Sequence, residues 1–81
     1  MERAEITEKV IACVKDSLGL ADDAELTEAT TLKDLGADSF DQLEIMVALE
    51  EAFDITLEDA AEDMSSVETV GQTVDIVSSQ L

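Results

Sequence analysis

The chain contains no histidine, tryptophan, tyrosine or proline, and Cys13 is its single cysteine. Without histidine it lacks the side chain most often used for proton transfer near neutral pH, and no Cys/His zinc site can form. A lone cysteine cannot make an internal disulfide, which suits a reducing compartment. No apolar run is long enough to cross a membrane, and no secretory signal is present. We therefore expect a cytoplasmic protein with no membrane contact, no bound metal and no catalytic activity of its own.

Positive charge is scarce as well. Four basic residues stand against 21 acidic ones, which gives a net charge of −17. All four bases precede Asp34, and the 13 acids from Asp34 onward occur without a base. The phosphates of nucleic acids and anionic membranes would be repelled, so we expect binding to neither. Basic protein surfaces are the natural complement, although the acids could also serve solubility alone.

Length and composition favour a small helical domain. Eighty-one residues with 46% hydrophobic content suffice for one domain, residues 1–81, with a small core. The absence of proline, together with only three glycines, favours helices over turn-rich β structure.

The first half of the chain predicts one helix followed by a long loop. Residues 3–18 place Ile6, Val10 and Val14 on one side of a helix, and Gly19 is a suitable residue to end it. Cys13 lies at the edge of that stripe and is interpreted as a small hydrophobic residue rather than a reactive thiol. Residues 19–37 predict a loop attached to the core by four leucines: Leu20, Leu26, Leu32 and Leu35.

Residues 39–53 predict a second helix with two apolar sides. One side should pack on the core, and its members are Ile45, Met46, Leu49, Ala52 and Phe53. The nearly opposite side carries three further apolar residues: Phe40, Leu43 and Val47. Because Glu44 and Glu51 flank this second side, we interpret it as a strip for binding a partner rather than as a second buried face.

Two more helices are predicted after residue 55. Residues 56–63 suggest a short third helix capped by Thr56, and Ser65 with Glu68 could cap the last one. That last helix carries an apolar stripe made of Val67, Val70, Val74, Val77 and Leu81. Gly71 inside it costs about 1 kcal/mol relative to alanine, which close packing against a neighbour would explain.

The resulting fold class is all-α: a small four-helix bundle of three longer helices and one short one, with a long loop between the first two. The residues expected in its core are Ile6, Val10, Val14, Leu35, Ile45, Leu49, Phe53, Val70 and Val74.

The most informative stretch is Leu35-Gly36-Ala37-Asp38-Ser39-Phe40-Asp41. Asp38 is a good N-cap, and Asp41 stands three positions later, where a capping box places its acid. Gly36 permits a turn just before the cap. Ser39 should therefore be exposed in the first helical turn, where free N–H groups favour a phosphate.

This stretch, with the acidic and apolar helix that follows, resembles the acyl carrier protein family, of the free-standing bacterial type. Weaker similarity lies at residues 18–20 and 69–77. In that family the matching serine carries 4′-phosphopantetheine, whose thiol holds acyl groups as thioesters. The resemblance implies that Ser39 is the attachment residue and that the chain is a carrier, not an enzyme. Without the resemblance, Ser39 would be interpreted as an ordinary serine at a helix start.

The resemblance also implies partners. They are a phosphopantetheinyl transferase (holo-carrier synthase), acyltransferases, ketoacyl synthases and other pathway enzymes with basic patches. The carrier itself is expected to be a monomer. Acidic positions that match the family, together with the apolar strip, give the expected partner-binding residues: Asp38, Phe40, Asp41, Leu43, Glu44, Val47, Glu50 and Glu51.

Several alternatives stay open. Fatty acid biosynthesis is the main expectation, followed closely by a specialised lipid or polyketide pathway. An aminoacyl or peptidyl carrier of the same fold is a third, and an acidic helical interaction module without a prosthetic group is a fourth. The chain departs from the family in having Phe40 where leucine is usual, Glu58 where proline is common, and a longer segment at 60–68.

The acid excess generates a first prediction. Carboxylates without nearby bases repel one another within a screening length of about 10 Å at 0.1 M salt. Added salt should therefore raise the melting temperature, measured by circular dichroism. A melting temperature that stays constant between low and high salt would show that mutual repulsion costs the fold nothing.

Overall fold

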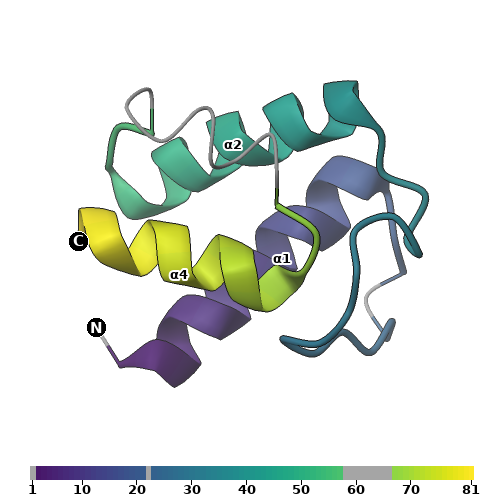
Figure 1. Cartoon of the computed structure of the whole chain (residues 1–81), viewed down its shortest axis with the longest axis horizontal. Helices are drawn as coiled ribbons and strands as arrows, with labels where there is room; N and C mark the ends of the chain where they lie inside the picture. Colours follow the sequence, from purple (N-terminus) through teal and green to yellow (C-terminus); the bar gives the residue numbers. More distant parts are fainter. Residues whose placement is uncertain (1, 22, 58–66) are drawn as a thin grey trace.

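The computed structural model describes residues 2–21, 23–57 and 67–81. Within these ranges it contains three helices: α1 (Arg3–Leu18), α2 (Ser39–Phe53) and α4 (Val70–Gln80). Figure 1 shows α1 packed on both α2 and α4, with the long loop between α1 and α2 on one side of the molecule. None of the described helices has the length and apolar character needed to span a bilayer.

The helix predictions are confirmed for 3–18 and 39–53, and the all-α class holds throughout the described ranges. The predicted third helix falls mainly on residues 58–66, which lie outside the described residues. Thr56 and Leu57, at its expected start, are described and are not helical. The four-helix count therefore stays a prediction.

The core has the predicted composition with one exception. Eight of the nine predicted core residues are buried, whereas Leu35 is only partly buried. Leu32 takes the inward position instead, because its N–H donates to the carbonyl of Glu68 at 2.8 Å and brings its side chain into the core. Leu81 of the predicted stripe is exposed, since it follows the last residue of α4. The other buried residues are Leu57, Val67, Val77 and the polar Thr73.

Gly19 ends α1 as predicted. It adopts a left-handed conformation with φ of 66°, which glycine reaches without steric cost. The N–H of the next residue, Leu20, donates to the carbonyl of Lys15 at 2.9 Å and satisfies one of the last carbonyls of α1.

The prediction that Ser65 and Glu68 cap the last helix is wrong. Thr69 is the N-cap: its hydroxyl accepts the N–H of Gln72 at 3.2 Å, and the Gln72 side chain accepts the Thr69 N–H at 3.1 Å. The reason is tertiary. Thr69 forms an isolated antiparallel β-bridge with Thr31 of the long loop, so the backbone is extended up to Thr69 and the helix begins only at Val70.

Gly71 permits a close approach of the loop, as the sequence suggested. Its N–H donates to the carbonyl of Glu28 at 2.9 Å. A Cβ atom at this position would lie 3.0 Å from that carbonyl oxygen and 3.2 Å from the Glu28 Cβ. The absence of a side chain at position 71 therefore lets the loop lie close against the first turn of α4.

This contact predicts that Gly71→Ala destabilises the protein although alanine is the better helix former. The propensity gain of about 1 kcal/mol should be outweighed by crowding against the Glu28 backbone, which costs about 1–3 kcal/mol. Thermal unfolding of both proteins provides the measurement. Ser78→Ala, at an exposed position of α4, is the control for propensity alone. A higher melting temperature for Gly71→Ala would show that the loop backbone moves to accommodate the added methyl group without loss of stability.

Candidate functional site

Ser39 is the first residue of α2, and its side chain is exposed. The preceding Asp38 accepts the N–H of Asp41 through Oδ1 at 3.0 Å, and the Asp38 N–H donates to Oδ2 of Asp41 at 3.2 Å. This reciprocal capping box is the one predicted from the sequence. It fixes where the helix starts and therefore where the Ser39 hydroxyl lies.

The first turn of α2 retains two free donors. The Asp41 N–H is bonded to Asp38, and the Gln42 N–H donates to the Asp38 carbonyl at 3.0 Å. The N–H groups of Ser39 and Phe40 donate to no acceptor in the described part of the chain. Because helix N-termini also carry partial positive charge, a phosphate esterified to the Ser39 hydroxyl would meet favourable groups.

The segment before Ser39 is held by a turn around one carbonyl. The Leu32 carbonyl accepts the N–H groups of Leu35 and Ala37, each at 3.1 Å. Gly36 has φ of 83°, which confirms the predicted glycine-dependent turn. Since Leu32 is buried, this turn ties the approach to Ser39 to the core.

A groove of about 420 Å³ opens beside the start of α2. Ala37 and Gln42, which flank Ser39 in the sequence, contribute to its wall, and Gln42 Nε2 donates to the Val67 carbonyl at 3.4 Å. The described residues that line it are Thr31, Lys33, Asp34, Ala37, Gln42, Val67 and Glu68.

The predicted apolar strip on α2 is exposed rather than buried on both sides. Phe40 is 77% exposed, Leu43 56% and Val47 50%, and with Glu44 they line a shallow groove of about 350 Å³. On the opposite side Ile45, Leu49 and Phe53 are buried. Two members of the predicted core side differ, since Met46 is partly buried and Ala52 is exposed.

The five acids predicted to face partners do not share one environment. Asp38, Glu44 and Glu51 are exposed, whereas Asp41 and Glu50 are partly buried. The second carboxylate of the capping box belongs to Asp41. Glu50 accepts the N–H of Leu57 through Oε2 at 3.0 Å and so holds the chain after α2. Sequence reasoning missed this internal role because Leu57 lies seven residues after Glu50 and beyond the end of α2.

Comparison with known proteins decides the family. Residues 8–77 match the family model described as the phosphopantetheine attachment site. An acyl carrier protein of Guillardia theta is 39% identical over 82 aligned positions that cover the whole chain and 98% of that relative. The chain belongs to the acyl carrier protein family. The match to the attachment-site model indicates a covalently attached 4′-phosphopantetheine.

Other relatives agree with this assignment. Acyl carrier protein 2, chloroplastic, of Hordeum vulgare is 43% identical over 74 residues, which are 90% of this chain and 57% of that protein. The chain thus spans little more than half the length of the plant relatives it matches. The crystal structure of an acyl carrier protein from Thermotoga maritima superposes with a TM-score of 0.78 at 29% identity, covering 99% of this chain and 91% of that one.

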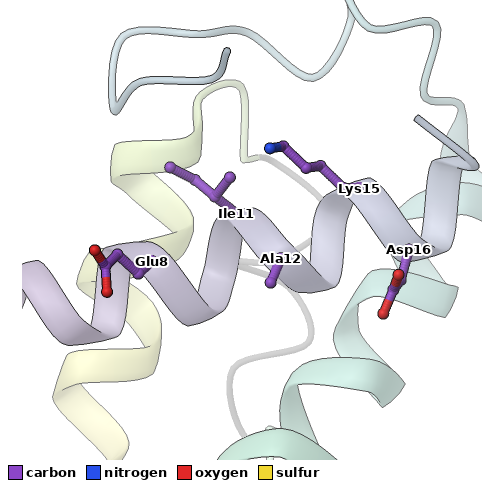
Figure 2. A pocket seen from close by; sticks show the side chains of 5 residues that line it. All are labelled: Glu8, Ile11, Ala12, Lys15 and Asp16. Carbon is purple, nitrogen blue, oxygen red and sulfur yellow. The ribbon is translucent and has the colours of Figure 1, made fainter. Parts of the chain in front are cut away.

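A third groove, of about 370 Å³, lies along α1. The described residues that line it all belong to this helix: Glu8, Ile11, Ala12, Lys15 and Asp16. Figure 2 shows Ile11 and Lys15 directed toward one side of the helix, with Ala12 and Asp16 toward the other. Neither α2 nor the turn before Ser39 contributes a described residue to this groove.

Cys13 behaves as the small hydrophobic residue that was predicted. It is partly buried against α2, and its Sγ lies 3.9 Å from the carbonyl of Ala48. Burial raises the pKa of the Cys13 thiol, and the nearby Asp16 raises it further. Both effects disfavour the reactive thiolate. Among the described residues, no group of three or more metal-ligating side chains gathers.

Proposed function

We propose that Ser39 is the attachment residue of this acyl carrier and that its hydroxyl forms a phosphodiester with 4′-phosphopantetheine. When bound, the group supplies the thiol that holds an acyl chain as a thioester. The observation that supports Ser39 is its exposed hydroxyl at the first position of a capped helix whose two leading N–H groups have no acceptor among the described residues. Ala37 and Gln42 would line the path of the arm away from the hydroxyl.

At this site the chain positions the Ser39 hydroxyl, and the partner enzyme carries out the reaction. The capping box of Asp38 and Asp41 fixes the serine, and the free N–H groups of Ser39 and Phe40 would donate to the phosphodiester oxygens. The flanking groups of the capping box are both carboxylates, and the sequence has no histidine. Removal of the hydroxyl proton therefore falls to the partner transferase.

The exposed strip of Phe40, Leu43 and Val47 is proposed as the centre of the partner-binding face, with acids around it. Glu51 supports this view because it stands in the last turn of α2, where the helix dipole disfavours an acid. An acid at a position where it costs stability suggests a role in binding. Basic patches on partners would be steered to it over distances of about a screening length. Asp41 and Glu50 are secondary members of this face because they are bonded internally.

We propose fatty acid biosynthesis as the pathway, and a phosphopantetheinyl transferase, acyltransferases and ketoacyl synthases as the partners. The support comes from the names of the relatives and from their sequence similarity to this chain. In the Guillardia theta protein this similarity covers the whole chain. A specialised lipid or polyketide pathway is the second candidate, favoured by the large exposed side chain of Phe40. Aminoacyl loading and a module without a prosthetic group have no observation in their favour.

The location is proposed from two sources. The single cysteine and the lack of an apolar span suggest the cytoplasm, whereas the plant relatives carry the word chloroplastic in their names. A plastid is therefore the alternative, and fractionation of the source cells with an antibody against the chain would distinguish the two.

The attachment proposal predicts the result of a modification experiment. Incubation with coenzyme A and a broad-specificity phosphopantetheinyl transferase should add one phosphopantetheine per chain, measured by intact mass. Ser39→Ala should accept none while retaining its helix content. Ser78→Ala, which removes an exposed hydroxyl elsewhere, should be modified at the normal rate. Modification of Ser39→Ala would place the site at another residue.

Phe40 predicts a difference in partner use. Its ring presents more apolar area and a stiffer shape than leucine, directly after the attachment residue. Condensing enzymes from general fatty acid synthesis should therefore use this carrier poorly, and Phe40→Leu should improve them from a few-fold to about a hundredfold, corresponding to about 1–3 kcal/mol of pocket fit.

Condensation rates on matched acyl forms of the two proteins measure this effect. Phosphopantetheine transfer and helix content should differ little between them, which serves as the internal control. Equal condensation rates would show that Phe40 does not select partners and would remove the support for a specialised pathway.

A further inference from the structure

Arg3 joins three parts of the fold that are far apart in the sequence. Its Nε donates a hydrogen bond to Oε1 of Glu28 at 3.1 Å, and its Nη2 contacts the same oxygen. Its Nη1 donates to Oδ1 of Asp75 at 2.8 Å. One guanidinium at the start of α1 therefore binds both the long loop and the middle of α4.

Glu28 begins a segment that we call the strap, residues 28–32, which lies along the start of α4. The carbonyls of Glu28 and Thr30 accept the N–H groups of Gly71 and Val70, at 2.9 and 3.0 Å. At the far end of the strap, the Leu32 N–H donates to the carbonyl of Glu68 at 2.8 Å. Arg3 thus secures the end of the strap that lies opposite Leu32.

The strap continues directly into the turn that positions Ser39. The Leu32 carbonyl anchors this turn by accepting the N–H groups of Leu35 and Ala37, and Asp38 follows as the N-cap of α2. The described chain from Glu28 to Asp38 is consequently a connected series of hydrogen-bonded contacts. Loosening its first contact would release the end of the segment that leads to the attachment residue.

The charge of Arg3 matters because the chain has only four basic residues against 21 acidic ones. The net charge is −17, and Glu28 and Asp75 are two acids that would repel each other without the guanidinium between them. Both pairs remain accessible to solvent, so dissolved ions can screen them. Salt should act on these pairs in the opposite direction to its effect on the carboxylate repulsion in the rest of the chain.

We propose that Arg3 is an ionic latch on the strap, so that the order of the segment leading to Ser39 decreases when salt screens the latch. This inference goes beyond the proposed function and does not depend on modification of Ser39.

Amide hydrogen exchange of the full chain, followed by NMR, tests the latch. Arg3→Ala is compared with Lys33→Ala, because each substitution removes one positive charge and Lys33 lies just beyond the strap. At about 20 mM salt, the amides of Leu32, Val70 and Gly71 should exchange several-fold faster in Arg3→Ala than in Lys33→Ala. At about 1 M salt, where the screening length is about 3 Å, the exchange rates of these amides should be the same in the two variants.

A second pair of variants separates the latch from general repulsion. Glu28→Gln and Glu25→Gln each remove one negative charge from the loop. If only repulsion mattered, both substitutions should slow the exchange of the strap amides equally. The latch predicts faster exchange of the same amides in Glu28→Gln. Gly71→Ala should also loosen the strap, but by an amount that does not change with salt, because no charge is altered.

Two results would overturn the latch. The first is equal exchange in Arg3→Ala and Lys33→Ala at low salt, which would assign the effect to net charge alone. The second is a difference between them that persists unchanged at 1 M salt, which would make Arg3 a packing residue rather than an ionic one. The exchange of Val14 and Leu49, both in helix interiors, reports any difference in global stability between the variants.

Discussion

The backbone pairing between the long loop and the start of α4 is the interaction on which the rest of this structure depends. The α1–α2 connection is long for so small a domain, and a loop of this kind must bond its polar backbone groups somewhere. It does so by antiparallel contact between Thr31 and Thr69 and by offering carbonyls to the first N–H groups of α4. The same bonds satisfy a helix terminus and a loop at once.

This pairing has consequences at both of its ends. Toward α2 it buries Leu32, whose carbonyl accepts the hydrogen bonds of the turn before Ser39. This turn is thereby held to the core. Toward α4 the pairing brings the Glu28 carbonyl so close to position 71 that a Cβ atom there would lie 3.0 Å from its oxygen. The proposed attachment site is therefore supported from a distance, by contacts between residues 36 to 43 positions apart, although the site itself is a local capping motif.

The acids of the chain lie in at least two kinds of environment that sequence alone does not separate. Asp38, Asp41 and Glu50 accept backbone N–H groups and shape the ends of α2. Glu44 and Glu51 are exposed beside an apolar strip that is left uncovered by the described chain. An exposed apolar surface rimmed by charge of one sign suits brief encounters with basic enzymes, because steering speeds association while a small contact area permits release.

The features of this protein that depend on neighbours in the chain could be predicted from its sequence. Helix periodicity set the bounds of α1 and α2, Gly19 ended α1, and the spacing of Asp38 and Asp41 set the capping box at Ser39, because each signal acts within one or two turns. Tertiary structure decided what depends on distant backbone. Leu32 rather than Leu35 entered the core, Thr69 rather than Ser65 capped α4, Gly71 met Glu28, and Glu50 turned inward to Leu57. In each of these cases the bonding partner lies outside the local pattern, so only the packed chain could select it.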